Sequence, residues 1–349
     1  MVRSSAMKTD TVFFSLLAVL WVILIYPIML FPALAKEEVI VSGITFPNTI
    51  TDDQWKVFTS NLDQYADPPL TLKMMIRGEI GSEENMVSAL RRGRVQVAAP
   101  STAGTSSILP ELAVIQLPYL FESAGQMDFI LDRVLPDPLD SLMRDKGLVF
   151  LHWIDAGWVS IYAKDLLTEP DHVTGYKMRT PYSPAAQIMA TVLKADVIYM
   201  SYPEIIPALQ TGLIDGGITS DYGFVTGGLE QEVNYFILTQ HTYDTGLMIA
   251  NKTWFESMST KNRSLLRSAY GDISSFRQRS RNYTASELAR LPFRSAVEVV
   301  KLTDDQRKRW VIATRPTHRR LLDSLGSIAV ELYEVVEEGK RRYANGLTN

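Results

Sequence analysis

The chain has 349 residues, 46% of them hydrophobic and 21% charged, which is long enough for about two domains of roughly 150 residues each. This composition excludes collagen-like, disordered and disulfide-stapled classes. The 35 basic and 39 acidic side chains give a formal charge of 35 − 39 = −4, and no stretch is basic and aromatic enough to form a nucleic-acid groove. The chain has no cysteine, so disulfides, thiolate metal sites and a lipid-modified N-terminal cysteine are also excluded.

The first 35 residues have the pattern of an export signal. Arg3 and Lys8 precede an uncharged, apolar run over residues 11–35, and the Ala-Leu-Ala tripeptide that ends at Ala35 matches the small-x-small cleavage site of a signal peptide. We therefore expect cleavage after Ala35 and a periplasmic protein. The alternative is an uncleaved membrane anchor, because an apolar run of this length could cross about 30 Å of hydrocarbon.

The first part of the mature chain alternates short strand patterns with helical ones, as α/β proteins do. A βαβαβ opening is predicted, with helices that begin at the capping box Thr51-x-x-Gln54 and after Ser82. The predicted strands of this unit cover residues 39–41, 70–76 and 95–99. Helices at about 123–134 and 138–146 then lead to an apolar strand at 148–154.

A second α/β unit begins near Gly157 and includes a helix that ends at Gly212. Its predicted strands cover 159–163, 176–180 and 197–200, and its helices cover 184–194 and 203–210. Strands at 235–238 and 247–250 bring the chain back, and everything beyond Trp254 has a helical pattern. We expect two lobes that share crossing segments and enclose a ligand between them. Lobe one is predicted to comprise residues 36–156 and about 244–285, and lobe two residues 157–243 and about 286–349 with the C-terminal helices.

Signatures of catalysis are absent, since the sequence contains no nucleophile elbow, phosphate loop or His-Glu-x-x-His motif. The four histidines are scattered without ligand spacing, so we expect no metal and no cofactor. Arg179 lies in the predicted strand 176–180, and open α/β sheets hold ligands outside the carboxyl ends of their strands. The alternative for Arg179 is an ordinary surface charge. The Ser/Thr-rich run at 101–107, which includes Thr102, could either bind an anion or cap a helix.

Five short motifs occur in the order and spacing of a known family, over about residues 38–255. They are Gly81-Ser82-Glu83, Leu117-Pro118-Tyr119-Leu120-Phe121, the stretch from Asp171 to Arg179, Glu204 followed by Ala208-Leu209-Gln210-Thr211-Gly212, and Asp215-Gly216. The chain thus resembles the DctP-type solute-binding proteins of tripartite ATP-independent periplasmic (TRAP) transporters. This resemblance implies a two-lobed α/β periplasmic-binding-protein fold (type II-like) with long C-terminal helices. It also implies a small organic-acid ligand, the small and large membrane subunits of a TRAP transporter as partners, and no enzymatic activity.

By motif position, Arg179 is similar to the arginine with which the family clamps a ligand carboxylate. A planar guanidinium suits this role because it donates two parallel hydrogen bonds to a carboxylate. Where many members have a further arginine, this chain has Gly157-Trp158, which favours a monocarboxylate over a dicarboxylate. The other residues predicted to bind the ligand are Trp158, Tyr182, Thr219, Ser220, Tyr222, Asn48 and Thr102. For the aromatic residues, packing between the lobes is the alternative.

Two other functions stay open at this stage. A membrane-anchored extracytoplasmic sensing module would retain the apolar N-terminal segment. An enzyme on the same lobes would need an acid/base pair, for which Glu204 and Asp215 are the candidates, although we expect Glu204 to open a helix. The tail beyond residue 260 is rich in arginine, and we predict that a positive helix face there reaches solvent. That face would be either an ordinary solvated surface or a docking surface for the permease.

Overall fold

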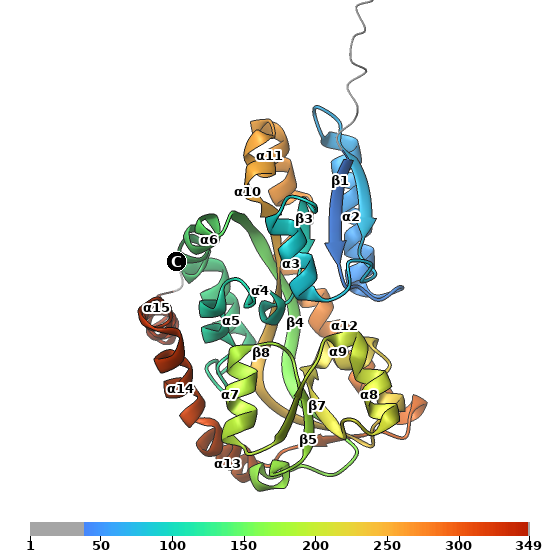
Figure 1. The fold of residues 1–349 in the computed structure, drawn as a ribbon, viewed down its shortest axis with the longest axis vertical. Coiled ribbons are helices and arrows are strands. Elements are labelled where there is room, and N and C mark those ends of the chain that lie inside the picture. Colours follow the sequence, from blue (N-terminus) through green and yellow to red (C-terminus); the bar gives the residue numbers. More distant parts are fainter. Residues whose placement is uncertain (1–37, 348–349) are drawn as a thin grey trace, which may run out of the picture. The chain divides into compact units, whose positions relative to one another are not determined.

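The computed structural model describes residues 38–347, and the arrangement of their helices and strands is shown in Figure 1. The predicted export signal and its cleavage site lie outside the described residues. Within residues 38–347, no helix is both long enough and apolar enough to cross a membrane.

One mixed sheet of nine strands organises this part of the chain. The strands follow the order β2-β1-β3-β8-β4-β7-β5-β6, and β9 pairs with β8. Their bounds are β1 Glu38–Gly43, β2 Thr71–Met75, β3 Val97–Ala99, β4 Leu148–Ala163, β5 Lys177–Thr180, β6 Asp196–Tyr199, β7 Gly216–Ser220, β8 Tyr235–Asn251 and β9 Glu298–Lys301. Helices are interleaved with the strands, which confirms the predicted α/β class.

The helices before β8 are α2 Ile50–Tyr65, α3 Glu83–Arg91, α4 Thr102–Thr105, α5 Ala124–Phe129, α6 Pro136–Asp145, α7 Pro184–Val192, α8 Ile205–Thr211 and α9 Asp221–Thr226. The helices after β8 are α10 Lys252–Ser257, α11 Thr260–Ser268, α12 Ile273–Arg294, α13 Asp304–Thr314, α14 Pro316–Leu325 and α15 Ser327–Ala344. Short turns of other helix types are η1 Pro110–Gln116, η2 Ile130–Val134, η3 Pro170–Val173, η4 Tyr202–Glu204 and η5 Leu229–Gln231. Ser82 caps α3 as predicted, whereas α2 begins earlier than predicted because Thr49, not Thr51, accepts the capping hydrogen bond.

Two long antiparallel strands, β4 and β8, connect the two halves of the sheet. The first half of β4 pairs with the end of β8, Leu148 opposite Asn251, and its second half pairs with the start of β8, Ala163 opposite Tyr235. We call the half with β1, β2 and β3 lobe one and the half with β5, β6 and β7 lobe two. The sequence predicted two short strands where each long strand runs. In β4 the chain passes a bulge at Gly157, whose φ of 89° suits glycine, without leaving the sheet.

Each lobe has its own hydrophobic core. In lobe one, α2 buries Trp55, Phe58 and Leu62 against the sheet, and Trp55 and Phe58 meet the ring of Tyr270 edge-on. Full burial of a large apolar side chain stabilises a fold by about 1.5–3 kcal/mol. In lobe two, Phe224 of α9 stacks on Phe236 of β8 with 3.9 Å between the ring centroids. Because each lobe is stabilised by its own core, the space between the lobes does not have to be filled by packed side chains and can hold a ligand.

The tail beyond Trp254 is not wholly helical, since β9 adds a parallel strand to the start of β8, and the sequence-based expectation was wrong there. Trp310 of α13 packs in a core cluster with lobe-two residues. Val336 of α15 packs instead in a lobe-one cluster, so the tail contacts both lobes. The lobe boundaries drawn from the sequence stay a prediction.

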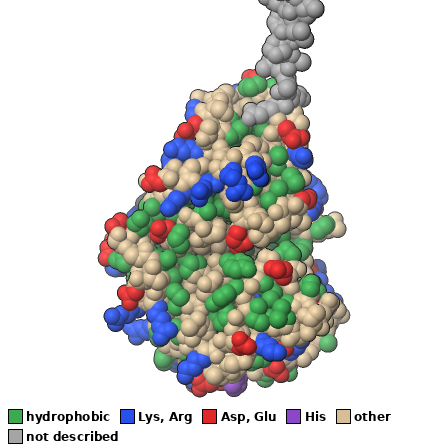
Figure 2. All heavy atoms as spheres, viewed as in Figure 1, with side chains coloured by type: hydrophobic (Ala, Val, Ile, Leu, Met, Phe, Trp, Pro, Cys, Tyr) green, Lys and Arg blue, Asp and Glu red, His purple; other side chains and the backbone are tan. Residues whose placement is uncertain are grey.

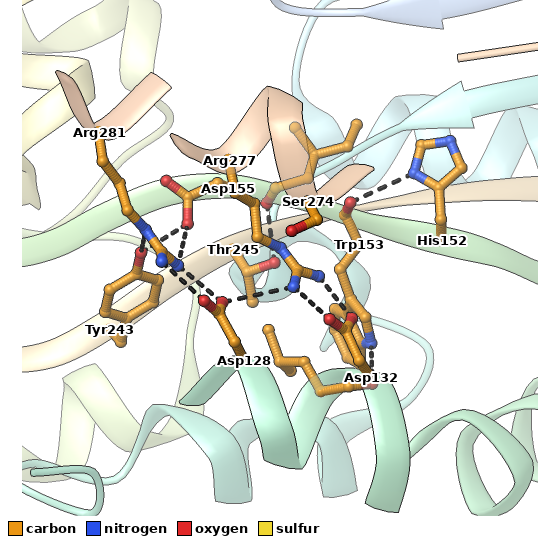
Figure 3. A network of polar contacts seen from close by, with 12 residues as sticks. Asp128, Asp132, His152, Trp153, Asp155, Tyr243, Thr245, Ser274, Arg277 and Arg281 are labelled. Carbon is orange, nitrogen blue, oxygen red and sulfur yellow. Dashed lines mark hydrogen bonds and ion pairs between the residues drawn. The ribbon is translucent and has the colours of Figure 1, made fainter. Parts of the chain in front are cut away.

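Two arginines of the tail are turned inward, whereas most of its other Arg and Lys side chains are exposed. Arg277 of α12 is buried and donates to Asp132 at 2.6 and 2.7 Å, and Arg281 donates to Asp128 with both terminal nitrogens at 2.7 Å. Figure 3 shows this network between α12, α5 and η2. Arg309 of α13, whose side chain is about half exposed, forms two 2.6 Å bonds with Glu169 at the surface. On the face shown in Figure 2, Lys and Arg side chains form a short row across the upper half and are elsewhere interspersed with Asp and Glu.

Candidate functional site

A cavity of about 210 Å³ is lined by residues of both lobes. Lobe one contributes Glu83 at the start of α3 and Ser101 before α4, and lobe two contributes Arg179 of β5 and Ser220 of β7. Asp244, on the crossing strand β8, also lines it. Pockets for drug-sized ligands measure roughly 300–1,000 Å³, so this cavity suits a small molecule.

Arg179 is the basic group of the cavity. Its side chain is only 5% exposed, and burial lowers the pKa of the guanidinium, which nevertheless stays charged at neutral pH. Nε donates to the carbonyl of Met200 at 3.0 Å and Nη1 to the carbonyl of Ile218 at 3.1 Å. Because a guanidinium has five N–H donors, these two bonds leave three donors without an acceptor among the described residues. Two backbone carbonyls thus orient the group while most of its hydrogen-bonding capacity remains available.

The local sequence explains why the arginine points into the cavity. Arg179 is next to last in β5 and pairs with Gly217 of β7 on one side and Ile198 of β6 on the other. The parallel strands β5, β6 and β7 end at the same edge, where Ser220 is the last residue of β7 and Met200 follows β6. The carboxyl ends of parallel strands are where α/β sheets hold ligands, as the sequence predicted for Arg179.

Four other predicted residues line the same cavity, namely Tyr182, Thr219, Ser220 and Tyr222. Ser220 also caps α9, because its hydroxyl accepts from the N–H of Gly223 at 3.1 Å. The hydroxyl of Tyr222 is buried without a hydrogen-bond partner among the described residues. The cavity therefore combines one guanidinium with hydroxyl groups and aromatic rings.

Three predicted residues do not line the cavity, which corrects their predicted placement. The ring of Trp158 packs edge-on against Tyr243, with 4.9 Å between centroids, at the margin of a lobe-one core. Thr102 is fully buried and its hydroxyl donates to the carbonyl of Thr245 at 2.7 Å. Asn48, at a φ of 61°, precedes α2 in a turn where its N–H donates to Asp52. Packing and turn formation account for these three.

Sequence reasoning missed several polar residues of the cavity. Asp244 accepts hydrogen bonds from the N–H of Thr245 at 3.0 Å and from Gln116 at 3.4 Å, and burial raises its pKa to about 7. Burial also raises the pKa of Glu83, whose carboxylate accepts from the N–H and hydroxyl of Ser101. The Gly81-Ser82-Glu83 motif drew attention to Glu83 but did not indicate that it lines the cavity. No motif marked Asp244, which is a single acid within a long strand.

His241 also lines the cavity and was treated as a scattered histidine in the sequence. It is almost fully buried, and burial lowers its pKa to about 3. Its Nδ1 lies 2.8 Å from the hydroxyl of Thr239. At neutral pH the ring is therefore uncharged, and it adds hydrogen-bonding capacity but no positive charge.

The two acids named for an enzyme are not part of the cavity lining. Glu204 forms a capping box with Ser201, because its carboxylate accepts a hydrogen bond from the N–H of Ser201 at 2.7 Å. The hydrogen bond from the Ser201 hydroxyl and, to a lesser extent, the one from the Ser201 N–H lower the pKa of Glu204. Asp215 lies 3.8 Å from Lys164 in a partly exposed ion pair. Among residues 38–347, no group of three or more His, Asp and Glu side chains could hold a metal ion.

The sequence is similar to a known protein family and to characterised members of it. The family model described as bacterial extracellular solute-binding protein, family 7, matches residues 41–324. The chain is 24% identical over 299 residues to the C4-dicarboxylate-binding periplasmic protein DctP of Rhodobacter capsulatus, which covers 85% of this chain and 90% of that protein.

Two solved structures share the fold. A TRAP periplasmic solute-binding protein of Shewanella oneidensis with bound succinate has a TM-score of 0.81 at 19% identity, covering 88% of this chain and 100% of that one. The sugar acid binding protein of Advenella mimigardefordensis in complex with galactonate has a TM-score of 0.81 at 23% identity, covering 87% and 99%. These likenesses confirm the predicted two-lobed fold.

Proposed function

We propose that this chain, which belongs to bacterial extracellular solute-binding protein family 7, captures a small monocarboxylic acid in the cavity and delivers it to the membrane subunits of a TRAP transporter. The observation that carries the proposal is Arg179, a buried guanidinium with three unused N–H donors on the wall of a cavity between two lobes. A carboxylate accepts two parallel bonds from such a group, which sets both its position and its orientation. The proposed place of action is the periplasm, after removal of the export signal.

The preference for one carboxylate follows from the charges of the cavity. Arg179 is the only Arg or Lys among its described lining residues, which also include Glu83 and Asp244. A second ligand carboxylate would lose its hydration without gaining a cation, and burial of an unpaired charge is costly. The relatives do not decide this point, since one is named for C4-dicarboxylates and one solved structure holds galactonate.

Calorimetric titration of the purified protein tests the proposal. Butanoate, 4-hydroxybutanoate and 3-hydroxypropanoate represent the monocarboxylates, and succinate and malate the C4-dicarboxylates. We expect at least one monocarboxylate to bind more tightly than both dicarboxylates. Thermal unfolding provides a second readout, because a ligand at 100 times its dissociation constant stabilises the folded state by about 2.7 kcal/mol. Tighter binding of succinate or malate than of every monocarboxylate would refute the ligand class.

Location and delivery need separate measurements. N-terminal sequencing of the protein recovered from the periplasm should begin at Lys36, whereas a membrane-bound protein that retains residues 1–35 would favour the anchored sensing module. Uptake into vesicles that contain the small and large TRAP subunits should require this protein. Equal uptake without it would argue against the transport role.

A further inference from the structure

The carboxylates of this cavity are not neutralised by arginine in the way that the buried Asp155 is. Asp155 accepts from Arg281 at 3.0 Å and from the hydroxyl of Tyr243, and Arg281 also holds Asp128. Figure 3 shows this cluster with its arginines between the acids. Asp244 follows Tyr243 directly in β8, and because neighbouring strand residues point to opposite faces, it lies on the other side of the sheet, where it lines the cavity. Among the described residues it has no ion-pair partner.

One oxygen of Asp244 is a free acceptor in the cavity, whose lining also includes the partly buried carboxylate of Glu84. Both hydrogen bonds that Asp244 receives within residues 38–347 go to Oδ1, so Oδ2 has no donor there. Glu83 differs, since the backbone and the side chain of Ser101 engage its two oxygens. Glu83 therefore adds negative charge, and Asp244 adds both charge and an unused hydrogen-bond acceptor.

A simple charge count shows what a bound acid would meet. Arg179 supplies one positive charge, whereas Glu83, Glu84 and Asp244 supply three negative ones when ionised, and His241 is neutral. Repulsion from Glu83 adds to burial in raising the pKa of Asp244. A ligand with only a carboxylate would occupy Arg179 and increase the excess of negative charge. A ligand that also carries a cation would reduce that excess and fill the free acceptor.

We infer that the cavity takes a zwitterionic acid, with the carboxylate on Arg179 and an ammonium or amidinium group on Oδ2 of Asp244. The inference rests on the proposed function, because it needs Arg179 to hold a carboxylate. It makes Asp244 the residue that selects amino acids and related zwitterions over hydroxy acids of the same length. Arg179 has three N–H donors left and Asp244 one acceptor oxygen. A small molecule with a carboxylate at one end and a cationic N–H group at the other would bond to both residues.

Matched pairs of ligands test the inference by calorimetry on the purified protein. The pairs are 3-aminopropanoate with 3-hydroxypropanoate, 4-aminobutanoate with 4-hydroxybutanoate, and 5-aminopentanoate with 5-hydroxypentanoate. The series varies the spacing between the two ends. At the best length we expect the amino acid to bind about tenfold to hundredfold more tightly, because hydrogen bonds to charged groups are the stronger ones.

Two variants separate the role of Asp244 from general effects. Asp244→Asn keeps the shape and the Oδ1 acceptor but removes the charge, so the amino acid should lose its advantage while the hydroxy acid should bind at least as tightly as before, because less negative charge then opposes its carboxylate. Asp221→Asn is the matched control, since Asp221 is another buried acid whose pKa burial raises to about 7, but it bonds to Ser160 and does not line the cavity. The Asp221→Asn variant should prefer the amino acid over the hydroxy acid to the same extent as the unmodified protein.

The outcomes distinguish this inference from the proposed function. Equal or tighter binding of the hydroxy acids overturns the zwitterion while leaving the carboxylate site intact. An amino-acid preference that survives Asp244→Asn overturns the role of Asp244. Failure of all six acids and of butanoate to bind overturns the monocarboxylate function, and the inference fails with it.

Discussion

Replacing Arg179 by alanine removes the guanidinium from the cavity wall while leaving the strands that carry it. Truncation of one partner of a buried, hydrogen-bonded charge pair costs about 2–5 kcal/mol, and each 1.4 kcal/mol corresponds to about tenfold in affinity. Arg179 is only 5% exposed, so solvent does little to screen its bond to a ligand. We therefore expect the affinity for the acid to fall roughly 30-fold to several thousand-fold.

The same substitution should leave the fold intact. Arg179 forms no ion pair among the described residues, and the two carbonyls it binds, those of Met200 and Ile218, belong to residues that line the cavity. Water can enter the cavity and replace the lost donors. The thermal midpoint without ligand should therefore stay close to that of the unmodified protein.

Calorimetry and thermal unfolding on three variants make this prediction testable. Arg179→Lys should also lose at least tenfold in affinity, because an ammonium cannot reproduce the two parallel bonds of a guanidinium. Lys177→Ala is the matched control, since Lys177 is an exposed cation two residues earlier in β5. Near-native affinity in a folded Arg179→Ala variant would remove this residue from the binding site.

Three further predictions concern stability. Arg281→Met leaves Asp155 buried without its cation and should lower the free energy of unfolding by about 3–5 kcal/mol, measured with urea; an unchanged midpoint would contradict the role of the network. Burial lowers the pKa of His152 from 6.5 to about 4. Below pH 6.5 the unfolded chain therefore binds a proton at this histidine more readily than the folded one, and the free energy of unfolding should fall as the pH drops toward 4, by about 2 kcal/mol at pH 5. His152→Gln should flatten the pH profile of the urea midpoint over that range, and an equally steep profile would argue against a neutral buried ring. Gly217→Ala brings a Cβ against the Tyr162 side chain and the backbone carbonyl of Arg179 and should lower the midpoint in calorimetric melting, whereas a normal melt would show that both the ring and the neighbouring strand can shift.

The order of the elements could be predicted because the alternation of patterns is a local property of the sequence. Ser82 and Gly212 mark helix ends by their own chemistry, and both do so in the structure. Continuity of β4 through Gly157 could not be predicted, since a glycine at positive φ occurs in turns and in bulges alike. β9 is short and pairs with a distant strand, so its environment, not its composition, decides its conformation.

The candidate site was only partly accessible to the same reasoning. Arg179 could be found because a charge in an apolar strand is unusual and its flanking motif is specific. Trp158 was placed in the cleft from sequence position, but one bulge in β4 and the ring of Tyr243 decide where it packs. Asp244 gains its importance from the face of β8 on which it falls and from the partners it lacks, and neither is visible in the sequence.

The strand pair β4 and β8 also constrains how the two lobes can move. Both lobes are attached to the same two hydrogen-bonded strands, so any rotation of one lobe against the other must twist this ribbon. Register shifts interrupt the ladder at three places, between Phe150 and His152, between Asp155 and Gly157, and between Val159 and Ile161. The middle interruption lies opposite Asp244. Asp244 lies on this connecting ribbon and Arg179 on a strand of lobe two, so a ligand that bridges the two groups would tie lobe two to the ribbon and oppose its rotation.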